Sequence, residues 1–131
     1  MVYVNDNAGE WSASREELVE RMGASDHADM LEELRPGRDT AFVMKGRHSI
    51  FYGTAVEHLL RELGVERIVL AGQVTEQCIL YSALDAYLRD FAVVVPRDAV
   101  AHIHPHLAEA ALEMMERNLH AEVTEAADVR F

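Results

Sequence analysis

The sequence predicts a three-layer α/β domain in which helices cover both faces of a parallel, doubly wound (Rossmann-like) sheet. Segments of strand length alternate with helical segments along the chain, and this order gives parallel sheets with right-handed helical crossovers. The strand candidates are apolar throughout instead of alternating, as in sheets buried on both faces. The length of 131 residues suits one domain, which we assign to residues 1–131.

The chain opens with a strand candidate at Val2–Asn5 that runs into turn-forming residues. A helix is expected after it, because Ser14 and Glu17 have the spacing of a capping box and Gly23 stands where the helix should end. The apolar side chains at helical spacing in this segment are Leu18, Val19 and Met22.

A short helix, a strand and a second helix are expected between Leu31 and Gly64. Leu31 and Leu34 indicate a short helical piece, and Ala41–Met44 is an apolar strand candidate followed by Lys45. Residues 54–57 have the spacing of another capping box, which predicts a helix that ends at Gly64. The apolar face of that helix consists of Val56, Leu59, Leu60 and Leu63.

The second half continues the alternation. The pattern predicts strands at Arg67–Gly72 and Phe91–Val95, with a helix from Thr75 to about Arg89 between them. Pro105 suits the first turn of a long helix that runs to about Leu119. Residues 121–124 form a last short strand candidate.

Composition excludes several classes of protein. The net charge of −11 and the acidic pI of about 4.9 argue against nucleic-acid binding. No apolar run is long enough to span a membrane, which takes roughly 20 residues, and no signal peptide is recognisable. One cysteine cannot form an internal disulfide. We therefore expect a cytoplasmic protein that binds neither nucleic acid nor membrane.

The sequence contains one lysine, Lys45, and one cysteine, Cys78. Lys45 and the segment Gly72–Cys78 follow strand candidates, and the carboxyl ends of parallel strands share one edge of a sheet, where ligands bind. Cys78 falls in the first turn of its helix, where the partial positive charge favours the nucleophilic thiolate. Lys45 would add a full charge, and backbone N–H groups could hold an oxyanion. The alternatives are a small buried hydrophobe for the cysteine and a solvated strand end for the lysine.

Several blocks of sequence together resemble the isochorismatase-like cysteine hydrolases. The match covers nearly the whole chain, and the blocks are specific in combination. They are Tyr3–Trp11 (YVNDNAGEW), Lys45–Thr54 (KGRHSIFYGT), Leu70–Cys78 (LAGQVTEQC), Ala83–Ala86 (ALDA) and Val95–Ala101 (VPRDAVA).

The resemblance implies hydrolysis of a C–N bond in a small amide or ureide through a thiolate acyl-enzyme, with no cofactor. Cys78 matches the nucleophile and Lys45 the lysine of an Asp–Lys–Cys triad. A cis peptide bond is implied between Gln73 and Val74, with the backbone N–H groups of Val74 and Cys78 as the oxyanion hole. The family relationship also suggests a homo-oligomer.

One departure concerns the triad aspartate, which in the family ends a first strand that has no counterpart in this sequence. We therefore expect the domain to be N-terminally incomplete, with the family's first strand missing. A start site placed too late is the favoured explanation; a truncated, inactive relative or a strand supplied by another chain are the alternatives. Asp6 is a local substitute for the base, although its expected role is to shape the loop with Asn5 and Asn7 by Asx-type bonds. The competing function is a catalytically inactive scaffold or self-assembling fragment.

Candidate substrate-pocket residues come from the same segments, with core packing as the alternative for the aromatic ones. They are Asn5, Trp11, Phe51, Thr75 and Tyr81. We expect no bound metal, because Asp6-Asn7-Ala8 lacks the histidine of the Asp-x-His metal motif that it resembles. His102, His104 and His106 alternate around Pro105 and are expected to be surface residues.

Overall fold

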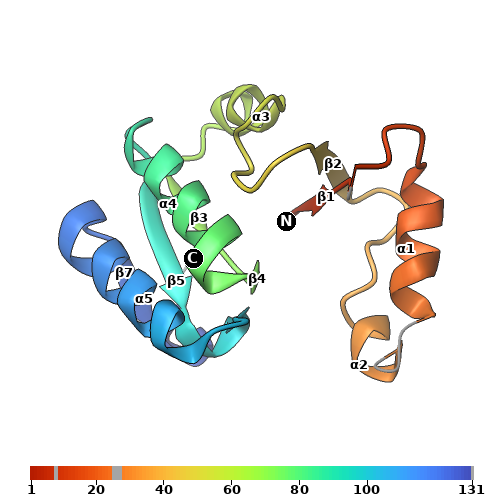
Figure 1. Ribbon diagram of the computed structural model, residues 1–131. Coiled ribbons are helices and arrows are strands. Elements are labelled where there is room, and N and C mark those ends of the chain that lie inside the picture. The colour runs from red at the N-terminus through yellow and green to blue at the C-terminus, as the bar shows by residue number, and fades with distance from the viewer. Residues whose placement is uncertain (8, 25–27, 131) are drawn as a thin grey trace. The chain divides into compact units, whose positions relative to one another are not determined.

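The computed structural model describes residues 1–7, 9–24 and 28–130, without the side chains of residues 22, 30 and 31. The side chains of Met22 and Leu31, which the sequence places in helical segments, therefore lie outside the described set. The chain divides into two compact units, Met1–Gly46 and Arg47–Phe131, and the elements of each are labelled in Figure 1.

The first unit is built on a parallel pair of strands, β1 (Val2–Asp6) and β2 (Ala41–Lys45). Their register runs residue by residue and ends with Asp6 opposite Lys45. Parallel neighbours need a long crossover between them, and this one contains α1 (Arg15–Gly23) and α2 (Ala28–Glu32). Strand β1 extends one residue beyond its expected end at Asn5. Helix α2 ends at Glu32, whereas the expected helical piece included Leu34.

The start of α1 confirms the first capping box. The backbone N–H of Ser14 donates to Glu17 Oε2 at 2.7 Å, and the N–H of Glu17 donates to Ser14 Oγ at 3.2 Å. The crossover returns to β2 through Arg15, whose guanidinium lies over the Phe42 ring at 5.4 Å and donates to the carbonyl of Arg38 at 3.2 Å. The capping box therefore starts the helix at Arg15, and this first helical residue holds the returning chain.

The second unit alternates short strands and helices. Its elements are α3 (Val56–Glu62), β3 (Arg67–Val69), β4 (Gly72–Gln73), η1 (Thr75–Ile79), α4 (Leu80–Tyr87), β5 (Ala92–Pro96), η2 (Arg97–Ala99), β6 (Val100–Ala101), α5 (Pro105–Leu119), β7 (Glu122–Thr124) and η3 (Ala126–Asp128). Strands β3, β5 and β7 form a parallel sheet with β5 in the centre, and β4 pairs in parallel with β6. Helix α5 has the bounds expected from Pro105 and the apolar pattern.

The core of this unit lies along β5 and the helices α4 and α5, which contact each other (Figure 1). Val93, Val94 and Val95 of β5 are all buried, as expected for a central strand with both faces covered. Ala83 and Ala86 of α4 and Met115 of α5 are fully buried. The small alanines let α4 approach its neighbours closely, and the long methionine side chain fills the remaining space.

Met115 offers a direct test of this core. We expect Met115→Ala to lower the free energy of unfolding by about 2–5 kcal/mol, because it removes buried methylene groups and leaves a cavity. Met114→Ala is the matched control, since Met114 is 48% exposed on the same helix. Chemical denaturation followed by circular dichroism measures both variants, and equal losses for the two would contradict this description of the core.

The prediction of a second capping box, at residues 54–57, is wrong. Helix α3 has Ala55 as its N-cap residue, without a side-chain capping bond. Thr54 Oγ1 accepts from the N–H of Val56 at 3.3 Å, and the Glu57 carboxylate accepts from Arg89 Nε at 2.8 Å. Arg89 lies far along the sequence, so a charge-assisted bond with a distant partner replaces the local one.

The prediction of an α/β fold with parallel strands is confirmed. Within the described residues, the paired strands form three separate parallel ladders, β1–β2, β3–β5–β7 and β4–β6. The single doubly wound sheet and the absent first strand stay predictions. Among the helices that the structure describes, none has both the length and the apolarity that a membrane span needs.

Candidate active site

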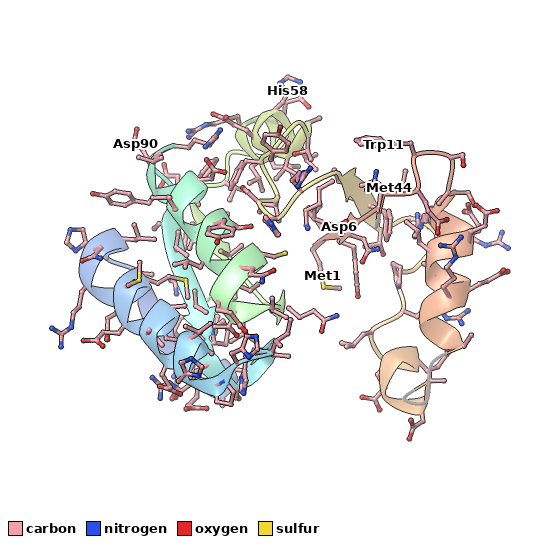
Figure 2. The ribbon with its side chains drawn as sticks, viewed as in Figure 1. Met1, Asp6, Trp11, Met44, His58 and Asp90 are labelled. Carbon is pink, nitrogen blue, oxygen red and sulfur yellow. The ribbon has the colours of Figure 1, made fainter. Side chains whose placement is uncertain are left out.

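The lysine half of the candidate site lies in the first unit, at the end of its strand pair. The register places Asp6 opposite Lys45, and Lys45 Nζ lies 3.0 Å from Asp6 Oδ2 (Asp6 is labelled in Figure 2). The lysine side chain is only 5% exposed and the aspartate side chain 45%. An ammonium group with so little access to water needs a close anionic partner, and the strand register supplies one.

The loop after β1 is held by its asparagines. Asn7 is buried, its Oδ1 accepts from the N–H of Gly9 at 3.0 Å, and its own N–H donates to the carbonyl of Lys45 at 3.0 Å. Asn5 Nδ2 donates to the Asp6 carbonyl at 3.1 Å. The Asp6 carboxylate also pairs with Lys45, and the expected share of Asp6 in shaping this loop stays a prediction.

The cysteine half lies in the second unit, where β4 is followed by the π-helical turn η1 and then by α4. The sequence predicts an ordinary helix from Thr75, but the carbonyl of Val74 accepts from the N–H groups of both Gln77 and Ile79, at 3.1 and 3.2 Å. Such wide turns are frequent at functional sites. Cys78 lies within η1 and is half-buried. The expected cis peptide bond between Gln73 and Val74 is confirmed.

A histidine that the sequence analysis quoted without assigning it a role contacts the cysteine. His48 Nδ1 lies 3.9 Å from Cys78 Sγ. The edge of the His48 ring faces Tyr81, with 5.4 Å between ring centroids and 60° between ring planes. His48 is exposed and lies between Lys45 and Ser49, at a variable position of the quoted motif, so only its polarity and its place beside the motif residues could have indicated a role.

Two side chains at the start of η1 fix it to the segment that precedes α5. Thr75, which is 1% exposed, donates from Oγ1 to the carbonyl of Ala101 at 3.0 Å. Glu76 Oε1 accepts from the N–H groups of Ile103 and His104, at 3.0 and 2.8 Å. Burial disfavours the charged carboxylate, but the backbone bonds, led by that of His104, outweigh it and keep the pKa of Glu76 below its ordinary value.

The depressed pKa of Glu76 makes stability depend on pH. Since the folded-state pKa lies below the unfolded one, this stabilisation is present above about pH 4.3, the ordinary Glu value, and is lost as the pH falls through the folded pKa. We expect Glu76→Gln to lower the unfolding temperature at neutral pH, because the amide also puts an N–H donor at Oε2, which has no partner among the described residues. The difference in unfolding temperature between Glu76→Gln and the wild type should become smaller at acidic pH.

Thermal unfolding measured from neutral to acidic pH tests this prediction. Glu116→Gln, which removes an exposed carboxylate from α5, is the matched control. A Glu76→Gln variant with the unfolding temperature of the control at neutral pH, or with a gap that widens in acid, would contradict the role of this carboxylate.

The structure distributes the candidate pocket residues between the two units. Asn5 is half-buried and Trp11 is 80% exposed in the first unit, where the indole lies beside Gly46. In the second unit Phe51 is buried and stacked with Phe91 at 6.0 Å, and Tyr81 is 42% exposed. Tyr81 therefore adjoins Cys78 through His48, while the role of the other candidates as a substrate pocket stays a prediction.

A metal-binding cluster is not found in the described part of the chain. Within residues 1–7, 9–24 and 28–130, no group of three or more His, Cys, Asp or Glu side chains could hold a metal ion. His104 and His106 lie with their ring centroids 6.2 Å apart and are exposed, in line with the surface position expected of them.

These features define an α/β domain of parallel strands and helices, with a half-buried cysteine in the first turn of a helical segment and a buried lysine at a strand end. The chain belongs to the isochorismatase domain family, whose model matches residues 2–128. The resemblance inferred from the sequence blocks is therefore confirmed.

Three similar proteins illustrate the family. The uncharacterized isochorismatase family protein YaaI of Bacillus subtilis is 35% identical over 124 residues, which cover 95% of this chain and 68% of that protein. The ureidoacrylate amidohydrolase RutB of Rhizobium rhizogenes is 30% identical over 112 residues, or 83% of this chain and 45% of that protein. The crystal structure of N-carbamoylsarcosine amidase from Thermoplasma acidophilum matches with a TM-score of 0.72 and 28% identity, covering 99% of this chain and 74% of that one.

The relatives include amidohydrolases, and the chain is shorter than they are. It spans about half the length of RutB and between two thirds and three quarters of the other two proteins. The fold of the chain is thus isochorismatase-like, and its homologues are hydrolases of that family.

Proposed function

We propose that this chain is a cysteine hydrolase that cleaves a C–N bond of a small amide or ureide. The observation that carries the proposal is Cys78, half-buried in the first helical turn after a strand of an isochorismatase-family domain. A helix start favours the thiolate, which is the nucleophilic form of cysteine. The relative RutB is a ureidoacrylate amidohydrolase, which supports a C–N bond as the target.

In this proposal the reaction has two halves. The Cys78 thiolate attacks the carbonyl carbon, and the backbone N–H groups of Val74 and Cys78 donate to the developing oxyanion. The C–N bond then breaks, the amine leaves with a proton from a nearby acid, and a thioester remains on Cys78. Water gives a proton to the group that protonated the amine and attacks the thioester, the C–S bond breaks, and the acid product leaves as the thiolate is restored.

Lys45 has an electrostatic role in this proposal. Its ammonium group is held by Asp6 at 3.0 Å and is largely shielded from water, so its charge is weakly screened. A positive charge favours both the thiolate and the oxyanion. The triad aspartate expected from the resemblance is not assigned to a residue of this chain.

The remaining parts of the proposal concern ligands and assembly. The substrate is a small molecule that contacts residues of the candidate pocket, among them Asn5, Trp11, Phe51, Thr75 and Tyr81. The chemistry uses the thiol and needs no cofactor. We also propose a homo-oligomer, which the exposed apolar side chains of Leu84 in α4 and of Leu88 directly after it would favour.

The release of ammonia or amine from a panel of small amides and ureides tests the proposal. The panel includes ureidoacrylate and N-carbamoylsarcosine, the compounds for which two of the relatives are named, and Cys78→Ala is the control. We expect at least one compound to be hydrolysed by the wild type and none by the variant. A chain that hydrolyses nothing, and whose single thiol reacts with iodoacetamide no faster than free cysteine, would instead be the inactive scaffold.

A further inference from the structure

We propose that Glu76 is a positioning residue of the candidate site, whose buried carboxylate holds the turn with Cys78 against the start of α5. The inference rests on the proposed function and adds to it a residue that acts through the nucleophile without touching the substrate. Glu76 is the second residue of η1 and lies two positions before Cys78. The proposed reaction leaves this carboxylate without a role.

The carboxylate of Glu76 is fixed by backbone groups from a distant segment. Its Oε1 accepts from the N–H groups of Ile103 and His104, at 3.0 and 2.8 Å, and the residue is only 8% exposed. Oε2 is buried as well and has no partner among the described residues. A buried oxygen without a hydrogen bond costs free energy, so stability alone does not explain this carboxylate.

The two N–H groups belong to the start of α5, which has no local cap. His104 is the N-cap residue of this 15-residue helix and makes no side-chain capping bond within the described residues, and Pro105 at the first helical position has no N–H. The N-terminus of a helix carries a partial positive charge that attracts an anion. The Glu76 carboxylate supplies that anion from the turn with Cys78.

Helix α5 is a firm support for this contact. Ala108, Ala111 and Met115 on its inner face are buried, and the helix contacts both α4 and η1. A carboxylate held by the end of a closely packed helix can move little relative to the core. The position of η1 is therefore set by α5 as well as by the strand that precedes the turn.

Two further contacts fasten the same side of the turn. Gln73 of β4 pairs with Ala101 of β6, and Thr75 Oγ1 donates to the carbonyl of Ala101 at 3.0 Å. Together with the Glu76 carboxylate, they attach the chain before the nucleophile to one segment. A π-helical turn is rare in proteins, so we expect this one to depend on the contacts that hold it.

The sign of its charge excludes an activating role for Glu76. A negative charge near a thiolate disfavours it, so a reaction that needs only the thiolate should not slow when the carboxylate is removed. Hydrolysis also needs the thiol and the oxyanion donors aligned with the carbonyl carbon, and a displacement of about 1 Å can slow such a step about 100-fold. Loss of the carboxylate should therefore slow hydrolysis but not alkylation.

The test compares Glu76→Ala and Glu76→Gln in the full chain, at a temperature where circular dichroism shows every variant to be folded. One readout is kcat and KM for a hydrolysed amide of the panel, and the other is the rate of alkylation of Cys78 by iodoacetamide at neutral pH. Glutamine keeps an oxygen that can accept from the two N–H groups, whereas alanine keeps neither oxygen. Glu116→Ala, which removes an exposed carboxylate from α5, is the matched control.

We expect Glu76→Ala to lose about 100-fold in kcat with little change in KM, while alkylation proceeds at least as fast as in the wild type. Glu76→Gln should lose less kcat, because the contact with α5 is partly kept. The control should have the wild-type kcat, KM and rate of alkylation. A merely structural role would lower the unfolding temperature and leave the kcat of the folded protein unchanged.

Two results would overturn the inference: a folded Glu76→Ala variant with the kcat of the wild type, or a fall in kcat matched by an equal fall in the rate of alkylation. If Glu76→Ala does not fold, Glu76→Gln decides by the same two criteria. A wild type that hydrolyses nothing in the panel, or hydrolysis that survives in Cys78→Ala, would instead overturn the proposed function, and this inference with it.

Discussion

Replacing Cys78 with alanine is expected to lower amide hydrolysis by about 10⁴-fold or more, because removing a nucleophile leaves only binding and oxyanion stabilisation. The effect should fall on kcat, since the thiol forms its bond after the substrate has bound. The same loss is expected for Cys78→Ser, whose hydroxyl is much harder to ionise than a thiol. Steady-state release of the amine at saturating substrate measures both variants.

The serine variant is also the control for folding. It changes one atom of a half-buried side chain, so its unfolding temperature should stay close to that of the wild type. Either variant retaining more than about one hundredth of the wild-type kcat would show that the thiol is not the nucleophile.

The second large effect is expected for Lys45. Lys45→Met keeps the length of the buried side chain and removes its charge, and it should lower kcat/KM by about 100-fold or more, the usual effect of losing one charge-stabilising group. In the proposed reaction the Lys45 charge also favours the Cys78 thiolate, so alkylation of Cys78 by iodoacetamide should slow as well. Steady-state kinetics measures kcat/KM, and intact-mass measurements over time give the rate of alkylation.

Stability separates this electrostatic role from a structural one. The Asp6 side chain is 45% exposed and can be hydrated when Lys45 is replaced, so Lys45→Met should cost only about 1 kcal/mol of unfolding free energy. Asp6→Asn, which keeps the ammonium group, is the matched variant and should lose less kcat/KM than Lys45→Met. Equal losses in the two variants, or a Lys45→Met variant with full activity, would contradict the assignment.

Much of the fold could be predicted because local signals agree with the tertiary structure. Pro105 and the apolar spacing gave the bounds of α5, and the run of valines in β5 indicated a strand covered on both faces. The Ser14 and Glu17 pair formed the expected capping box. The short strands β4 and β6 are two residues each, which is too short for any periodicity to reveal.

Where prediction failed, a distant partner decided the local structure. Glu57 was expected to complete a capping box but pairs with Arg89, which lies two residues beyond the end of α4. The π-helical turn η1 depends on the two bonds that Val74 accepts, and Thr75 and Glu76 tie it to the segment before α5. Local sequence patterns carry no information about such contacts.

The candidate site was predicted in its residue types and in part of its surroundings. The position of Cys78 after a strand and the cis bond at Gln73–Val74 came from the motif. The pairing of Asp6 with Lys45 could not be predicted in this way, because it depends on the register between β1 and β2, which neither strand's sequence reveals by itself. The contact of His48 with Cys78 also joins a loop to a helical turn thirty residues away, so no short-range pattern could indicate it.

The most direct test of the central claim is the mass of the protein during turnover. The chain has one cysteine, so a thioester formed on it appears as one added acyl group. We expect acid quenching within the first turnover of a hydrolysed amide to give that added mass in the wild type, on the peptide that contains Cys78, and none in Cys78→Ala. Continued release of amine by Cys78→Ala, or a wild-type burst of amine without any added mass, would contradict a reaction through Cys78.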